Sequence, residues 1–145
     1  MTPGLTTLTK NYMLKYFLNS LPEEVPASSP VFAGLLVDQG APDPEELVIG
    51  SGGYNRVPAE FAVVDGVAKN TSSITFPKAT TDWTSGTEKI THIAFYASHF
   101  DDNIGDYVSD VDDPMIAVLP LSEGETISAS EIFQLNPQAV KMQLI

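Results

Sequence analysis

The sequence has no cysteine among its 145 residues. Disulfide frameworks, thiolate zinc sites and cysteine nucleophiles are therefore excluded as sources of stability or chemistry. Positive charge is also scarce, because seven lysines and arginines stand against 19 aspartates and glutamates, for a net charge of −12. Binding to phosphate groups needs clusters of basic side chains, and here they are scattered singly. We therefore expect the chain to bind neither nucleic acid nor an anionic membrane surface.

Long apolar segments are missing as well. No run approaches the roughly 20 apolar residues that a membrane-spanning helix requires. The first residues also lack the basic flank and the apolar stretch of a secretory signal peptide. These patterns favour a protein that is made and used in a cytoplasm.

Catalytic patterns are absent too. The chain has only two histidines, His92 and His99. It contains no G-x-S-x-G, H-E-x-x-H or phosphate-binding glycine pattern. We therefore expect no enzyme, no catalytic residue and no cofactor. His92 lies within an alternating strand pattern, where a hydrogen-bonded structural role is the simpler interpretation.

The segment 99–113 is rich in acidic side chains. Six aspartates and Asn103 offer the hard oxygen ligands that calcium prefers, but their spacing does not fit an EF-hand loop. We expect a solvated charged loop and no metal. A weak calcium site is the alternative.

Residues 9–21 show the spacing of a short helix. Apolar side chains recur there every three or four positions, and Pro22 follows. The apolar surface is wider than one stripe, so one side of the helix is expected to pack on a neighbouring subunit. The candidate interface residues are Tyr12, Met13, Tyr16 and Phe17.

The rest of the chain alternates between strand and turn patterns. Residues 38–46 and 99–113 are expected to be loops. Frequent turn signals and the lack of alternating strands and helices favour a mainly β fold, an antiparallel β-sandwich or jelly-roll-like barrel, over residues 1–145 as one domain. The expected strands cover residues 31–37, 57–63, 67–76, 89–98, 115–121 with a break at Pro120, 127–135 and 140–145.

Several short patterns follow one another in a recognisable order. They are LTKNYMLKYFLNS at 8–20, VFAGLLVDQGAPDP at 31–44, the signature Gly52, Gly53, Tyr54 and Arg56 ahead of Phe61, then Asn70, Ile74, Phe76 and Pro77, Trp83, ITHIAFY at 90–96, and the turn with Leu121, Gly124, Glu125 and Thr126.

In this order and spacing, the chain resembles a family of small tailed-phage virion proteins, described as tail fibre-like or head decoration-like minor structural proteins. The resemblance covers about residues 8–135. Two segments depart from the family pattern: the stretch 99–113 is longer and more acidic, and the end after Asn136 adds a segment without a counterpart. The departures concern partner-specific surfaces.

The signature residues suggest scaffold roles. Gly52 and Gly53 permit positive φ and a tight bend. Tyr54 can bury its ring while its hydroxyl reaches a partner. Arg56 is expected to pair with a carboxylate inside the protein, and Trp83 to pack over one end of the sandwich.

The resemblance implies a non-enzymatic structural protein of the virion, assembled in the host cytoplasm. We expect it on the outer capsid surface, as a decoration, cement or head-fibre-base protein bound to the major capsid protein or to tail or fibre proteins. It is expected to form a homo-oligomer, with a trimer as one form. The alternatives are a tail or fibre-base component that joins a host-binding protein to the particle, and a carbohydrate-binding module.

Overall fold

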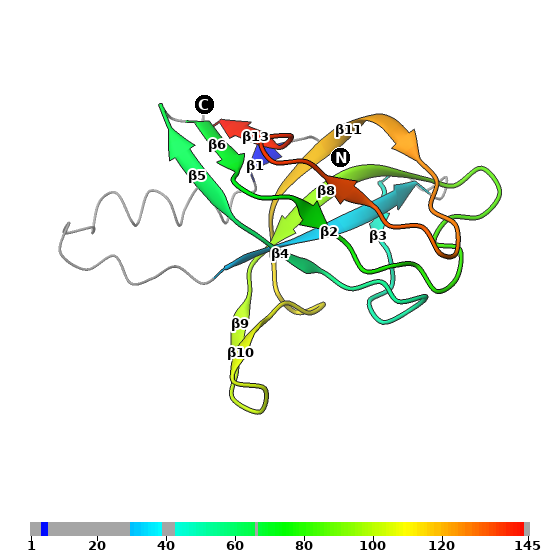
Figure 1. The fold of residues 1–145 in the computed structure, drawn as a ribbon, viewed down its shortest axis with the longest axis horizontal. Coiled ribbons are helices and arrows are strands. Elements are labelled where there is room, and N and C mark those ends of the chain that lie inside the picture. The colour runs from blue at the N-terminus through cyan, green and yellow to red at the C-terminus, as the bar shows by residue number, and fades with distance from the viewer. Residues whose placement is uncertain (1–3, 6–29, 39–42, 66, 144–145) are drawn as a thin grey trace.

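The fold is seen in a computed structural model that describes residues 4–5, 30–38, 43–65 and 67–143 (Figure 1). The helix expected over residues 9–21 lies outside these ranges, and so do Tyr12, Met13, Tyr16 and Phe17. All regular elements in the described ranges are β-strands, and every pairing between them is antiparallel. A search of the same residues finds no helix that could span a membrane.

The largest sheet has six strands in the order β1-β11-β8-β2-β3, with β4 also paired to β2. Its two central strands are β2 and β8, and six consecutive residues of β2 are buried. This burial on both faces is what the continuous apolar run at 31–37 predicts. The strand bounds are Gly4–Leu5 for β1, Val31–Asp38 for β2, Glu45–Glu46 for β3, Val57–Ala59 for β4, Lys89–Tyr96 for β8 and Met115–Glu125 for β11.

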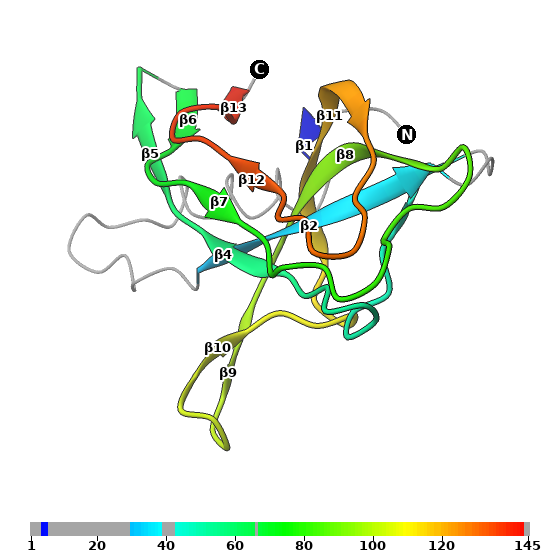
Figure 2. The same ribbon diagram turned by 45° about the vertical axis from the view of Figure 1, so that its right-hand side comes forward.

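Three smaller pairings complete the fold (Figure 2). Strands β5, β6 and β13 form a three-stranded sheet, β7 pairs with β12, and β9 pairs only with β10. Both views show the β9–β10 hairpin extending away from the other strands. The bounds are Phe61–Val64 for β5, Val67–Asn70 for β6, Ile74–Thr75 for β7, His99–Asp101 for β9, Asp106–Val108 for β10, Gln134–Leu135 for β12 and Lys141–Gln143 for β13.

The main core lies between the large sheet and two of the smaller pairings, β5–β6–β13 and β7–β12. Leu35 and Phe95 from the large sheet are fully buried, and they share one apolar cluster with Phe76 and Val140 from the opposite side. The ring of Phe61 in β5 meets Phe95 edge-on, with 5.1 Å between centroids. The prediction of a mainly β, antiparallel fold is confirmed.

The alternation predicted along residues 89–98 is wrong at one residue. Leu36 pairs with His92 but Val37 pairs with Ile90, so Thr91 is an extra residue in β8. Such a β-bulge turns the following side chains to the other face. Ile90 therefore joins the main core, whereas Ala94 and Tyr96, expected on its face, belong to a second buried cluster with Leu36 and Val118.

Two other expected strands end elsewhere. Strand β11 continues through Pro120 to Glu125, although its pairing with β8 shifts register between Pro120 and Glu125. Pro120 is exposed and lies beyond the stretch that pairs with β1, an edge position that tolerates the missing N–H. In contrast, only Gln134–Leu135 is a strand within residues 127–135. A local turn precedes it, in which the Ser128 N–H donates to Glu131 Oε1 at 2.8 Å.

The acidic segment 99–113 is not only a loop. Its first ten residues form the β9–β10 hairpin, in which Phe100 pairs directly with Tyr107. The turn between the strands is closed by the Gly105 N–H, which donates to the Asp101 carbonyl at 2.7 Å, with Gly105 at φ +76°. Aspartate and glycine are frequent in turns, so the composition of residues 99–113 predicts a loop and does not indicate the two short strands.

Candidate functional site

The sequence Ser51–Arg56 begins with a tight turn that needs glycine. Gly52 and Gly53 have φ values of +59° and +84°, a region that other residues rarely adopt. A Cβ atom on Gly53 would also lie 3.1 Å from the Lys78 carbonyl oxygen. The Gly52 carbonyl accepts hydrogen bonds from the Trp83 indole at 2.8 Å and from the Thr80 N–H at 2.9 Å. The turn is thereby fixed against residues 78–83.

Tyr54 follows this turn and is completely buried. Its ring is stacked near Phe76 and meets Trp83 edge-on, with centroid separations of 6.2 and 5.5 Å. Its hydroxyl accepts the Leu35 N–H at 2.9 Å and donates to Glu46 Oε2 at 2.7 Å. Burial, followed by the charge of Glu46, raises the pKa of Tyr54 far above its ordinary value. Both of these hydrogen bonds are made to groups of the same chain. The hydroxyl therefore serves the interior of the protein and not the contact with another protein that the sequence suggests.

Arg56 forms a two-pronged ion pair with Glu46. Its Nε lies 2.9 Å from Oε2 and its Nη2 lies 2.7 Å from Oε1, and the two side chains are only 3% and 16% exposed. The guanidinium also lies over the ring of Tyr96, 3.5 Å from the centroid. Burial alone lowers the pKa of Arg56, but the hydrogen bonds and charge of Glu46 outweigh it and raise that pKa above its ordinary value. The guanidinium therefore stays charged, and the ion pair joins β3 to the residue before β4.

The same guanidinium holds the base of the hairpin. Its Nη1 donates to Ser109 Oγ at 2.9 Å and also to the Asp110 carbonyl. Ser109 Oγ in turn donates to the Ala97 carbonyl at 2.7 Å. One buried arginine therefore connects the interior of the large sheet to the projecting β9–β10 hairpin.

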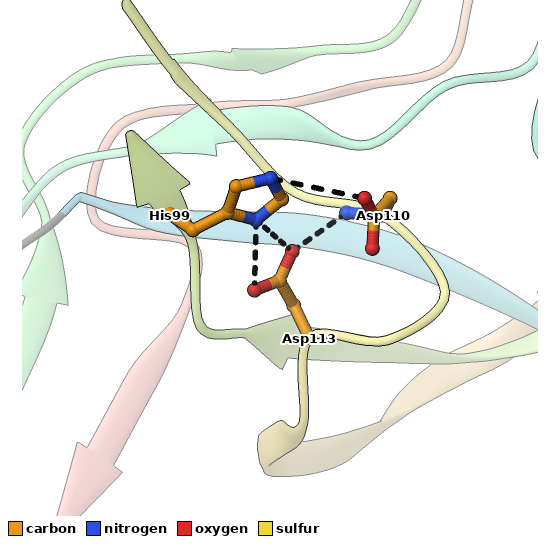
Figure 3. Close-up of side chains that lie close together, drawn as sticks. All are labelled: His99, Asp110 and Asp113. Carbon is orange, nitrogen blue, oxygen red and sulfur yellow. Dashed lines mark hydrogen bonds and ion pairs between the residues drawn. The ribbon is translucent and has the colours of Figure 1, made fainter. Parts of the chain in front are cut away.

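A second anchor is the triad formed by His99, Asp110 and Asp113, of which Asp113 is the most buried (Figure 3). His99 Nδ1 lies 2.9 Å from Asp113 Oδ2, and Nε2 lies 3.8 Å from Asp110 Oδ2. The hydrogen bond to Asp113 raises the pKa of His99. The Asp110 N–H also donates to Asp113 Oδ2 at 2.8 Å. The ring therefore bridges the two carboxylates, and this ion pairing explains why the three side chains lie close together.

Comparison with known families identifies the chain. Residues 4–143 match the family described as "Podophage GP4 fiber I protein gp80". The chain belongs to this family. The predicted resemblance to tailed-phage virion proteins is thus confirmed. No curated protein matches the sequence.

The match to the gp80 fibre family spans the cluster around Tyr54 and Arg56 as well as the hairpin. Of the residues singled out from the sequence, the structure brings Gly52, Gly53, Tyr54, Arg56 and Trp83 together. His92 lies apart from them, opposite Leu36 in the sheet. Its Nδ1 is 2.9 Å from Thr91 Oγ1, and partial burial lowers the pKa of His92.

Three members of the cluster around Arg56 are not predicted by the sequence: Glu46, Tyr96 and Ser109. Arg56 is the only arginine in the sequence, so an internal carboxylate partner was expected, but 19 acidic residues compete for that role. Glu46 stood in a segment expected to be a loop, and it is the short pairing of β3 with β2 that brings it inward.

Proposed function

We propose that this protein is a non-enzymatic structural component of a fibre on a tailed-phage particle. The match of residues 4–143 to a phage fibre family is the observation that carries the proposal. The protein's role in such a structure is to present fixed surfaces to other virion proteins, and the network around Arg56 is suited to that role. It ties the core to the hairpin through hydrogen bonds that are already formed in the isolated chain.

The surroundings of His99 support a role without catalysis. A histidine base needs a nucleophile within hydrogen-bond reach and a third group that orients the ring. Both ring nitrogens of His99 face carboxylates, which leaves neither for a hydroxyl nucleophile.

Carbohydrate binding receives less support from the structure. A hollow of about 280 Å³ borders Trp83 and Tyr54 and is also lined by the carboxylates of Glu45, Asp82 and Glu88. Sugar rings stack on exposed aromatic faces, but Trp83 is only 8% exposed and Tyr54 is fully buried. The aromatic side chains here serve the core of the protein.

For the location, we propose the base of a fibre on the outer capsid surface, with a homo-oligomer such as a trimer occupying symmetric sites. The short strands and turns differ from a long repetitive shaft, which supports a base rather than a shaft. Subunits that bind only the assembled shell stabilise it by mass action. The base of a tail fibre is the alternative, because the family description names a fibre without saying where it is attached.

The location is tested with particles that carry a tagged copy of the chain. Gold particles directed to the tag would be imaged by electron microscopy, with untagged particles as the control. Labels distributed over the capsid support the proposed site, and labels confined to the tail support the alternative. Purified particles without the chain would contradict a structural role.

A further inference from the structure

The β9–β10 hairpin and the segment that follows it, up to residue 113, expose much of the apolar surface of the described residues. Three of the six exposed large hydrophobic side chains in the described residues lie between positions 99 and 113. They are Phe100, 51% exposed, Ile104, 67% exposed, and Val111, 74% exposed. Phe100 and Tyr107 pair directly across the hairpin, with ring centroids 5.4 Å apart. Exposed aromatic and aliphatic side chains grouped in this way are typical of contact surfaces.

The hairpin and the segment that follows it are also acidic. Residues 99–113 contain six aspartates and no lysine or arginine. Asp101 lies directly opposite Asp106 in the register of the two strands. Like charges at directly opposed positions destabilise a pair of strands. This arrangement does not favour the hairpin's own stability, but a positively charged surface placed against it would relieve the repulsion.

An isolated two-stranded hairpin is marginally stable in water, yet this one is held firmly. Arg56 and Ser109 fix its base, and the His99–Asp113 pair joins its first residue to the segment that follows it. At the tip, Asp101 Oδ1 accepts the Asn103 N–H at 2.9 Å. A surface fixed before binding loses less conformational entropy when a partner docks.

We infer that the β9–β10 hairpin is a docking element that inserts its apolar side chains into a positively charged surface of another virion protein. This inference rests on the proposed function, because it names the contact through which the fibre component is held. The charge of this segment favours that occupant over the same hairpin of a second copy, since two segments that carry aspartates and no lysine or arginine repel each other. An anionic lipid surface is disfavoured for the same reason.

The test uses phage whose own copy of the gene carries an early stop codon and whose host supplies the full-length chain. Copies of the chain per purified particle are measured by quantitative mass spectrometry against the major capsid protein. Ile104→Ser is compared with Ile132→Ser, which removes the same side chain from another exposed position, 56% exposed, outside the hairpin. We expect about tenfold fewer copies for Ile104→Ser, the loss typical of a central contact, and unchanged copies for Ile132→Ser.

A charge-reversed pair gives an independent measurement. Asp102→Lys changes an exposed hairpin aspartate, and Glu123→Lys changes an exposed residue of β11 in the same way. The hairpin variant is expected to lower the number of copies and the β11 variant to leave it unchanged. Purified variants that melt as the parent does show that folding is intact.

The outcomes separate the two proposals. If the parent chain is present in particles and the hairpin variants are incorporated to the same extent as their controls, the docking inference is overturned. The structural role then still stands. Hairpin variants that are incorporated normally but fail to adsorb to cells would place the partner on the host and would also overturn it. Parent chain absent from purified particles would overturn the structural role itself.

Discussion

Arg56 and Glu46 form a closely matched ion pair, with both guanidinium-to-carboxylate contacts below 3 Å and both side chains largely withdrawn from water. Glu46 Oε2 also accepts the hydroxyl proton of Tyr54. The pair therefore connects three regions: Tyr54 after the turn at Gly52 and Gly53, strand β3 of the largest sheet, and the base of the hairpin. Removing either charged partner would leave the other without compensation in a buried setting.

Arg56→Ala is expected to lower the free energy of unfolding by about 3–5 kcal/mol, because an uncompensated carboxylate would remain where the pair is now. The variant also loses the bonds to Ser109 and the contact with Tyr96. Urea denaturation measures the change. Lys78→Ala is the control, since Lys78 is exposed and its removal takes away the same charge at little cost. Equal effects of the two substitutions would contradict a structural role of the Arg56–Glu46 pair.

Tyr54→Phe removes one oxygen atom from the core. The Leu35 N–H then loses its acceptor and Glu46 loses a donor, so the free energy of unfolding is expected to fall by about 1–3 kcal/mol. Tyr107→Phe, in the half-exposed hairpin, is the matched control and should change stability by less than about 0.5 kcal/mol. If the two variants have the same denaturant midpoint, the buried hydroxyl of Tyr54 contributes nothing to stability.

Gly53→Val is expected to destabilise the protein by about 1–3 kcal/mol or more, because a β-branched residue is strained at φ +84° and its Cβ would press against the Lys78 carbonyl. Gly86→Val separates the two causes. Gly86 also has positive φ, +60°, but a Cβ there would meet nothing within 4 Å. Thermal melts should show a larger loss for Gly53→Val. A melting temperature unchanged from the parent would exclude strain at this turn.

The two histidines are expected to titrate in a definite order. The hydrogen bond to Asp113 raises the pKa of His99 above 6.5, whereas burial lowers the pKa of His92 below it. Because the folded-state pKa of His99 is raised, its contribution to stability is complete below the unfolded value of 6.5 and is lost as pH rises through the folded value. Proton NMR titration follows both rings, and Asp113→Asn should lower the pKa of His99. The reverse order of titration would contradict the triad geometry.

The strands that could be predicted are those in which burial determines which positions carry apolar side chains. The apolar run at 31–37 and the alternation within 89–98 gave β2 and most of β8, since burial imposes a regular pattern on each. The change of face at Ile90 could not be foreseen, because the extra residue Thr91 is set by pairing with β2 and leaves no local signal. The break predicted at Pro120 is wrong for a related reason. The cost of a proline in a strand depends on whether a neighbouring strand needs its missing N–H, and β1 pairs with β11 only at Ala117 and Val118.

The hairpin and the ion pair were harder to predict because both depend on contacts between distant segments. Residues 99–108 have the composition of a loop, and their strands are stabilised by Arg56, more than 40 positions earlier in the chain. The need for a carboxylate beside Arg56 followed from chemistry, but the choice of Glu46 followed only from the pairing of β3 with β2.

The central claim is that this chain is a structural fibre component of the virion. It is tested most directly by cryo-electron microscopy of particles assembled with the chain and of particles assembled without it. We predict a difference density on the outer surface of the first particles that fits the β-strands and the projecting hairpin, with the hairpin at the contact with a neighbouring virion protein. Identical reconstructions of the two kinds of particle would contradict the claim.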